Sequence, residues 1–351
     1  MANSKRNIRT LTLPEMSSYF QSIGEAAFRA KQLHEWLWQK SARSFSEMSN
    51  LSVQLRKQLE EEFTLPSVSV AEEQFSADKT IKTAFQLADG KITEGVLIPT
   101  NKRMTACISS QIGCSLSCKF CATGKLKLMR NIQFDEIYDQ VAIIKEQAEK
   151  HYQKGLTNIV YMGMGEPLLN YSQLLKSVER ITAVDGLGMS PKRITVSTAG
   201  IAKLIKRLGD DDTKFNLALS LHAANDDKRS KIMPINEQNN LSSLTEALGY
   251  YYEKTGNRFT LEYIIFKDFN DELQDAQELT DFASKLPCKI NLIEYNPIDE
   301  GSFQQADPIK VDQFADYLES KNLIVNLRRS RGKDIDAACG QLANKNAAVA
   351  T

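Results

Sequence analysis

Three cysteines in one short stretch form the strongest chemical pattern in the sequence. They are Cys114, Cys118 and Cys121, in the order Cys-x-x-x-Cys-x-x-Cys. Thiolates are the usual ligands of iron–sulfur clusters, and a short loop can present three of them to one cubane. Three ligands leave one iron of a [4Fe–4S] cluster open to a further ligand. We therefore predict one [4Fe–4S] cluster per chain at this loop.

An open iron has a defined chemical use. It can chelate the amino and carboxylate groups of S-adenosylmethionine (SAM), and an electron from the cluster can then break the S–C5′ bond to release a 5′-deoxyadenosyl radical. The competing hypothesis is a non-enzymatic, zinc-stabilised RNA-binding protein, because thiolates also bind zinc. A closed zinc site needs four ligands. The chain has three histidines, none near the loop, and Cys107 could be the fourth ligand.

Composition and charge limit the remaining possibilities. The 44 basic residues equal the 44 acidic residues, so any RNA binding must use local patches rather than a general positive field. The N-terminus lacks the apolar segment of a signal peptide, and no apolar run approaches the roughly 20 residues that cross a bilayer. We expect a cytoplasmic protein with no membrane segment, in which thiols stay reduced.

The elements that must position this loop follow a simple plan. Residues 1–65 have apolar residues at helical spacing and predict a small helical accessory domain, and residues 66–104 predict a β-rich connector. Residues 105–342 alternate short apolar strands with helices, which predicts parallel βαβ units. The predicted strands include 158–162, 193–197, 216–220, 260–265 and 289–293, and the predicted helices are 134–150, 171–182, 241–253, 273–286 and 311–320. About six units are too few for a complete eight-fold barrel, so the expected fold class is α/β, a partial (β/α)6 TIM-like barrel. Residues 343–351 are expected to be a disordered tail.

Unusual residues follow the predicted strands. In a barrel of this kind, ligands lie at the C-terminal ends of the strands. The segments concerned are 163–167 (Gly-Met-Gly-Glu-Pro), 197–200, 220–222 and 295–297.

Several motifs, in the right order along the chain, resemble those of the RlmN/Cfr family of radical-SAM RNA methyltransferases. The motifs are Cys107-Ile-Ser-Ser-Gln-Ile-Gly-Cys-Ser-Leu-Ser-Cys-Lys-Phe-Cys-Ala-Thr-Gly, Met162-Gly-Met-Gly-Glu-Pro-Leu-Leu-Asn, Leu219-Ser-Leu-His and Asp334-Ile-Asp-Ala-Ala-Cys-Gly-Gln-Leu. The resemblance covers nearly the whole chain, and residues 1–65 resemble the RNA-engaging appendage of the family.

The resemblance implies a route for methylating an adenine carbon that is not nucleophilic. Cys339 takes a methyl group from one SAM, and the radical made from a second SAM removes a hydrogen from that S-methyl group. The resulting carbon adds to the base, and Cys107 then attacks the sulfur of Cys339 to release the product. Glu94 matches the family's base for the ring proton. Two SAM molecules are therefore consumed per turnover.

The resemblance also implies a SAM site and an RNA-binding face. His222 alone would more often be a core histidine, and Asn296 a turn residue. Two basic groups, 119–130 and 328–333, are expected at the rim of the barrel mouth, where they would contact phosphates. The implied SAM contacts are Gly165, Glu166, Ser197, Ser220, Leu221, His222 and Asn296.

The implied substrates are 23S rRNA and tRNA. The RlmN branch methylates C2 of an adenosine in 23S rRNA and of an adenosine in the tRNA anticodon loop, and the Cfr branch methylates C8 of the same rRNA adenosine. The two branches share their catalytic residues, and flanking sequence favours the C2 branch. A flavodoxin with its reductase is the expected electron donor, and we expect a monomer.

Overall fold

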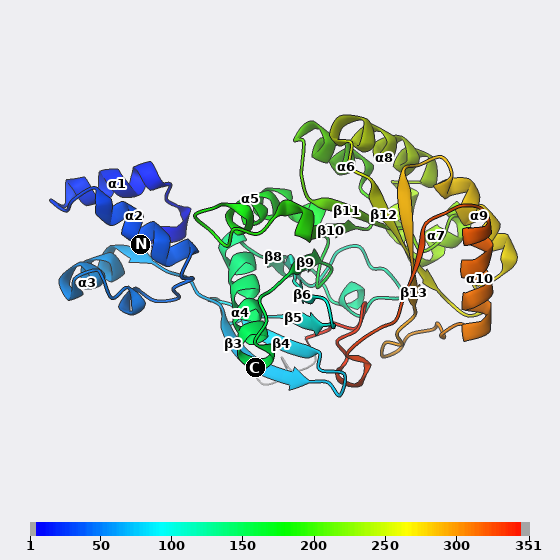
Figure 1. Cartoon of the computed structure of the whole chain (residues 1–351), viewed down its shortest axis with the longest axis horizontal. Coiled ribbons are helices and arrows are strands. Elements are labelled where there is room, and N and C mark those ends of the chain that lie inside the picture. The colour runs from blue at the N-terminus through cyan, green and yellow to red at the C-terminus, as the bar shows by residue number, and fades with distance from the viewer. Residues whose placement is uncertain (1–4, 345–351) are drawn as a thin grey trace.

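The computed structural model describes residues 5–344 and contains two lobes (Figure 1). The smaller lobe holds the N-terminal helices. Thr12 caps the first helix, and Glu15 completes its capping box. Ser52 caps the third helix in the same way, by accepting from the Leu55 amide. The helices are α1 (Leu13–Ser22), α2 (Phe28–Trp38) and α3 (Val53–Glu62), and β1 (Arg6–Asn7) pairs with β2 (Phe63–Thr64).

The larger lobe contains one sheet of ten strands, in the order β14-β13-β12-β11-β10-β9-β6-β5-β4-β3. The strands from β6 to β14 are parallel, and they alternate with helices, so the predicted α/β partial barrel is confirmed. The parallel strands are β6 (Met104–Cys107), β9 (Asn158–Tyr161), β10 (Ile194–Thr198), β11 (Asn216–Ser220), β12 (Phe259–Ile265), β13 (Cys288–Glu294) and β14 (Val325–Arg328).

The predicted connector is part of this sheet. Its three strands are antiparallel, and Val96 pairs with Cys107 where the connector joins the barrel. Backbone hydrogen bonds therefore run without interruption from the connector into the strand that precedes the cysteine loop. The strands are β3 (Ser69–Phe75), β4 (Ile81–Gln86) and β5 (Ile92–Pro99).

Helices cover the outside of the curved sheet (Figure 1). Their inward faces are apolar, as in α4, where Ile137, Val141 and Ile144 are fully buried. Two of the helices, α6 and α7, fall where no helix was predicted. The helices are α4 (Phe134–Tyr152), α5 (Tyr171–Thr182), α6 (Ala202–Asp210), α7 (Asp226–Ile232), α8 (Leu241–Thr255), α9 (Leu273–Ala283) and α10 (Pro308–Ser320).

The two lobes meet at α4. Arg9 of the small lobe forms an ion pair with Asp139 of α4 at 2.9 Å, and both side chains are fully buried. Asn7 donates to Asp135 at 2.7 Å, and the hydroxyl of Tyr138 donates to the carbonyl of Trp38. These contacts fix the accessory lobe on the outer helix layer of the barrel.

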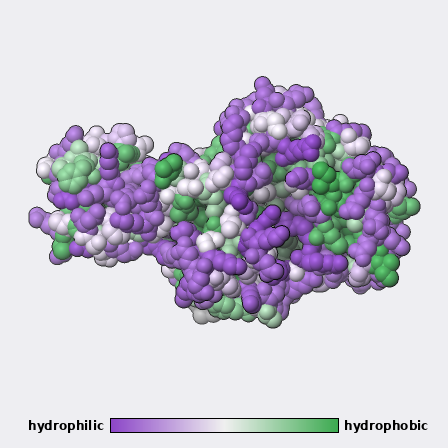
Figure 2. Space-filling model, in the orientation of Figure 1, coloured by the Kyte–Doolittle hydropathy of each residue, from purple (hydrophilic) through white to green (hydrophobic). Residues whose placement is uncertain are grey.

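Hydrophilic residues cover most of the face shown in Figure 2. Within residues 5–344, no helix combines the length and the apolar character needed to cross a membrane. Ala343 and Asn344, the first residues of the predicted tail, are held by hydrogen bonds to Glu94, so the order of the chain continues at least to residue 344. Residues 345–351 lie outside the described part of the chain.

Candidate active site at the mouth of the barrel

A cavity of about 320 Å³ opens at the C-terminal ends of the parallel strands. It brings together residues that the sequence separates by more than two hundred positions. Ten of the thirteen predicted site residues line it: Cys107, Cys114, Cys118, Cys121, Gly165, Glu166, Ser197, Ser220, His222 and Cys339.

The cysteine loop is closed at its base by a short pair of strands, β7 (Gln111–Ile112) and β8 (Arg130–Asn131). Gly113 at the entrance has φ +75°, and a side chain there would lie 2.1 Å from the carbonyl oxygen of Lys127. The loop turns around Gly124, where a Cβ atom would lie 2.6 Å from the Cys118 carbonyl. Glycine is therefore required at both positions by the close packing of the loop on itself.

The three cysteines of the loop are partly buried. Burial raises the pKa of Cys114 to about 11, and burial also raises the pKa values of Cys118 and Cys121. A thiol must lose its proton to bind iron, so loading of this loop releases protons and becomes weaker as pH falls. Neighbouring thiolates repel one another here, and a cationic iron core removes that repulsion.

The donor set fits a cubane better than a single ion. Among residues 5–344, no three His, Cys, Asp or Glu side chains are arranged to hold one metal ion. In a cubane each thiolate binds a different iron, so the three sulfurs stand further apart than around a single ion. Three cysteines on one loop line a cavity with room for a further ligand, and they supply the three thiolates that such a cluster needs.

Cys107 and Cys339 approach the cavity from opposite parts of the chain. Cys107 ends β6 and is buried, whereas Cys339 is exposed to the cavity. Burial raises the pKa of Cys107, and the neighbouring Cys339 raises it further. Surrounding protein likewise raises the pKa of Cys339, while Arg328 opposes that rise. The two thiols are thus near enough to interact electrically.

The segment that carries Cys339 is bound directly to the cysteine loop. The Ala122 amide donates to the Gly340 carbonyl at 2.7 Å, and the Thr123 hydroxyl donates to the Leu342 carbonyl at 2.7 Å. These bonds fix the position of Cys339 relative to the three-cysteine loop.

Three predicted site residues do not line the cavity. Leu221 is fully buried. Asn296 is buried too, and its amide donates to the Cys339 carbonyl at 3.2 Å. Glu94 on β5 is only 1% exposed, and its carboxylate accepts from the amides of Ala343 and Asn344 at 2.9 and 3.1 Å. In this structure Glu94 therefore anchors the segment that follows Cys339.

The segment after β9 serves the packing of the site. Gly165 has φ +93°, and a Cβ atom there would lie 2.4 Å from the Cβ of Gln111. The backbone at Gly165 therefore packs closely against Gln111, next to the cysteine loop. Both carboxylate oxygens of Glu166 accept backbone amides, from Leu168 at 3.0 Å and from Ala199 at 2.8 Å. Glu166 thus ties the end of β9 to the end of β10.

Ser197, Ser220 and His222 line the next part of the cavity. The two serine hydroxyls are 3.3 Å apart. Nδ1 of His222 accepts the Ile264 amide at 3.1 Å, which places the proton of the neutral ring on Nε2. Burial lowers the pKa of His222 to about 3, so the ring stays neutral at physiological pH. Its ring meets Phe120 of the cysteine loop edge-on, with centroids 4.7 Å apart.

Two charged residues of the site escaped prediction. Glu262 on β12 lines the cavity and accepts a hydrogen bond from Asn291 at 2.8 Å. The sequence signal was a single acidic residue inside an apolar strand. Arg229 on α7 is fully buried beneath the ends of β10 and β11. Arg229 lies in a charged stretch after a turn. Such a stretch is typical of a solvated helix face, so the sequence did not indicate that this arginine is buried at the site.

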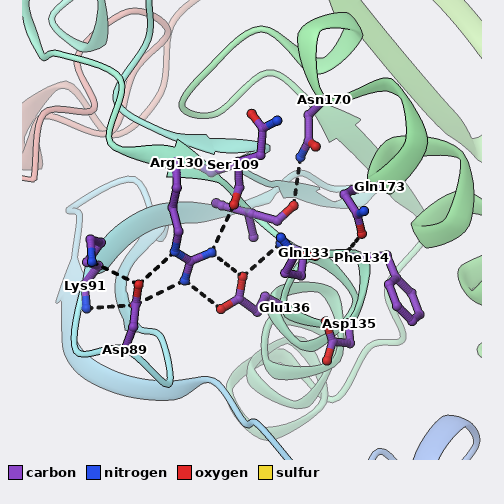
Figure 3. Close-up of polar contacts among 12 residues, drawn as sticks. Asp89, Lys91, Ser109, Arg130, Gln133, Phe134, Asp135, Glu136, Asn170 and Gln173 are labelled. Atoms are coloured by element: carbon purple, nitrogen blue, oxygen red, sulfur yellow. Dashed lines mark hydrogen bonds and ion pairs between the residues drawn. The ribbon is translucent and has the colours of Figure 1, made fainter. Parts of the chain in front are cut away.

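The basic groups at the rim are partly committed to the protein itself. Figure 3 shows Arg130 between two carboxylates, Asp89 at 2.8 Å and Glu136 at 2.7 Å. Arg329 and Lys333 both pair with Glu294, at 2.6 and 2.8 Å. The phosphate contacts expected at these three residues would have to compete with ion pairs inside the chain, and they stay a prediction.

A partial barrel with three cysteines at its mouth defines a radical-SAM protein, and the comparisons agree. A model of the radical SAM superfamily matches residues 108–280, and a model of the ribosomal RNA large subunit methyltransferase N-terminal domain matches residues 6–65. A crystal structure of a radical SAM methyltransferase from Sphaerobacter thermophilus superposes with a TM-score of 0.91 at 36% identity, covering 96% of this chain and 99% of that one.

Curated relatives narrow the class to one family. A probable dual-specificity RNA methyltransferase RlmN of Cytophaga hutchinsonii is 58% identical, over 97% of this chain and 93% of the relative. One from Christiangramia forsetii is 53% identical, over 98% and 97%. The chain belongs to the RlmN family of radical-SAM RNA methyltransferases. This membership contradicts the hypothesis of a non-enzymatic zinc-stabilised protein.

Proposed function

We propose that this enzyme methylates C2 of an adenosine in 23S rRNA and of an adenosine in the tRNA anticodon loop. The observation that carries the methylation of an adenine carbon is the meeting of Cys107, Cys339 and the three-cysteine loop around one cavity. The choice of C2 over C8 is supported by the flanking sequence and by the RlmN names of the relatives. The names of the relatives, which describe dual-specificity RNA methyltransferases, support two RNA substrates.

Cys339 is the proposed methyl acceptor. Its sulfur is exposed to the cavity, so it can attack the methyl carbon of a first SAM, with S-adenosylhomocysteine leaving and the thiol proton passing to solvent. Only the thiolate is a strong nucleophile. Arg328, which also lines the cavity, lowers the pKa of Cys339 against the effect of burial and so favours that thiolate.

Cys114, Cys118 and Cys121 are proposed to hold one [4Fe–4S] cluster, with SAM in the adjoining cavity. When bound, the cluster supplies the electron that cleaves a second SAM, and the adenosyl radical removes a hydrogen atom from the S-methyl group of Cys339. His222 can donate from Nε2 toward a ligand in the cavity, and Ser197 and Ser220 offer hydroxyls to a ribose or carboxylate. The SAM roles of Gly165, Glu166, Leu221 and Asn296 remain predictions from the family motif.

Cys107 is the proposed resolving residue. Addition of the methylene radical on Cys339 to the base leaves one unpaired electron on the adduct, which a bound, oxidised cluster would take back. The Cys107 thiolate then attacks the Cys339 sulfur, and a disulfide forms as the carbon–sulfur bond breaks. The pair of electrons stays with the methyl carbon, which takes a proton. The nearness of the two thiols supports this step.

Glu94 is the proposed acceptor of the ring proton, on its match to the family. The amides of Ala343 and Asn344 both donate to Oε2 of its carboxylate. Oε1, which lies 3.8 Å from Nζ of Lys82, is therefore the oxygen proposed to accept the proton.

Mass analysis of nucleosides tests the regiochemistry. Digested 23S rRNA and tRNA from cells with and without the gene are compared for 2-methyladenosine and 8-methyladenosine. Gene-dependent 2-methyladenosine in both RNAs is expected. Gene-dependent 8-methyladenosine would instead establish the Cfr-type reaction, and absence of both would refute the proposal.

The proposed partners follow from the same chemistry. A low-potential one-electron donor of the flavodoxin type, with its reductase, is proposed to reduce the cluster. The enzyme is proposed to act as a cytoplasmic monomer and to use two SAM molecules per turnover. Counting 5′-deoxyadenosine and S-adenosylhomocysteine per methylated base tests that stoichiometry, for which one of each is expected.

A further inference from the structure

Arg229 is a fully buried arginine that has no carboxylate partner in residues 5–344. Its guanidinium instead donates to neutral oxygen atoms of three segments. Nη2 donates to the carbonyls of Ala199 at 2.6 Å and Ser220 at 3.3 Å, and Nε donates to the carbonyl of Leu221 at 3.1 Å. Nη1 donates to the side chain of Asn236 at 2.7 Å.

A buried charge without a counter-ion is costly, because carbonyl dipoles replace water only in part. Burial lowers the pKa of Arg229 to about 10, so the guanidinium still carries its charge near neutral pH. Asp226 acts on it only from a distance, since Oδ1 of that carboxylate accepts from Asn236 and from the Leu241 amide. The described chain therefore does not balance this charge at close range.

The helix that carries Arg229 is packed against the cysteine loop. The Lys119 amide donates to the Ile232 carbonyl at the end of α7, at 3.0 Å. Ile232 and Met233 lie in the same apolar cluster as Phe120 and Cys118. Arg229 itself acts to lower the pKa of the Cys118 thiol against the effect of burial, so its fixed positive charge lies near the loop that is proposed to hold the cluster.

Arg229 also fixes the backbone that faces the cavity. The Ala199 peptide is held from both sides, because its carbonyl accepts from Arg229 and its amide donates to Glu166 at 2.8 Å. Ser197 and Ser220, at the ends of β10 and β11, line the cavity beside this peptide. One side chain therefore connects the ends of two strands to the support of the cysteine loop.

We propose that Arg229 is a positioning residue whose fixed positive charge balances the anionic iron–sulfur cluster and raises its reduction potential. This inference rests on the proposed cluster, but not on the identity of the RNA or of the methylated carbon. A [4Fe–4S] core with three thiolates is an anion, and one electron from a low-potential donor adds a second negative charge. A nearby cation stabilises the reduced cluster more than the oxidised one.

The test is a potentiometric titration of the reconstituted holoenzyme, followed by the EPR signal of the reduced cluster. Arg229→Gln removes the charge and keeps an amide donor, whereas Arg229→Lys keeps the charge and loses the planar fork. We expect the glutamine variant to lose at least tenfold in the equilibrium constant for one-electron reduction, a fall of about 59 mV. The lysine variant should stay close to the unmodified enzyme.

Arg9→Gln is the matched control, because Arg9 is also buried but is paired with Asp139 in the other lobe. It should lower the thermal stability and leave the cluster potential unchanged. Equal potentials in Arg229→Gln and the unmodified enzyme, at equal iron content, would overturn the proposal.

Loss of the cluster also gives a decisive outcome. If the glutamine variant fails to retain iron and the lysine variant retains it, the need for charge is supported. If neither variant retains iron, Arg229 acts by holding the backbone through its hydrogen bonds and not through its charge, and the proposal is wrong. Failure of the proposed RNA reaction would look different, since it would remove the methylated nucleoside and leave these potentials as predicted.

Discussion

Arg9 and Arg229 are both buried, yet their surroundings differ in one respect. At the seam between the lobes, Arg9 meets Asp139 at 2.9 Å, and burial, which alone would lower the pKa of Arg9, is outweighed by nearby carboxylates. At the cavity, Arg229 is surrounded by carbonyl oxygens, and burial lowers its pKa. At the seam, the charge of Arg9 is balanced by a carboxylate of the chain itself. Near the cavity, the proposed cluster would balance the charge of Arg229.

This contrast separates the two regions by function. Changes at the seam should affect folding and the docking of the accessory lobe. Changes around the cavity should affect chemistry more than stability, because several of its groups line the cavity instead of packing in the core.

The largest effect is expected from Cys339→Ala. Because Cys339 is the proposed methyl acceptor and is exposed to the cavity, the variant should make no methylated adenosine and should unfold at nearly the same temperature as the unmodified enzyme. Nucleoside mass analysis and a thermal melt measure the two outcomes. Methylated RNA from this variant would contradict the assignment.

At the seam, Asp139→Asn should act in the opposite way. It leaves the Arg9 charge buried without a partner, which typically costs about 3–5 kcal/mol. Denaturant unfolding of the holoenzyme measures the loss, and the spectrum of the cluster should be unchanged. A loss below about 1 kcal/mol would show that the seam pair is not needed.

His222 should make the stability of the enzyme dependent on pH. Its pKa is about 3 in the folded chain, against an ordinary value of 6.5 for a solvated histidine, so between these values the unfolded chain binds the extra proton. Stability should therefore fall by up to roughly 1.4 kcal/mol for each pH unit below 6.5 from this residue.

The matched variant for that prediction is His222→Asn. Asparagine tolerates the positive φ of this residue, +55°, and does not titrate. Unfolding curves of the two proteins between pH 7 and pH 4 should diverge, with the variant less sensitive to acid. Parallel curves would refute the role of His222.

The smallest effect is expected at the basic rim. Arg329 is paired with Glu294, so Arg329→Ala should change the dissociation constant for RNA by less than about twofold. Arg328 lines the cavity without an ion pair within residues 5–344, and Arg328→Ala should weaken binding more and reduce the salt dependence by about one charge. If both variants lost the same affinity for RNA, the ion pair of Arg329 would not explain any difference between the two arginines.

The sequence predicted much of this architecture because its signals are local. Apolar strands that alternate with amphipathic helices define the barrel, and the cysteine spacing defines the loop. Helix α6 (Ala202–Asp210) was missed because it is short and follows a glycine, and β14 was missed because its short strand alternates half-buried and exposed residues. Both elements depend on neighbours that are distant in the sequence.

The candidate site was predictable where a residue faces the cavity, and less so where a residue supports it. Ten of the predicted residues line the cavity, but Glu94 and Asn296 contact the Cys339 segment instead. Arg229 was missed because a charged residue on a short helix is usually solvated. Only the fold shows that the helix turns this residue inward.

The most direct test of the central claim is the fate of Cys107→Ala with RNA substrate, SAM and reductant under anaerobic conditions. If Cys107 resolves the intermediate on Cys339, the variant should accumulate a covalent protein–RNA adduct, and peptide mass spectrometry should find the base joined through one carbon to Cys339. Release of methylated RNA by this variant, with no adduct at Cys339, would contradict the account.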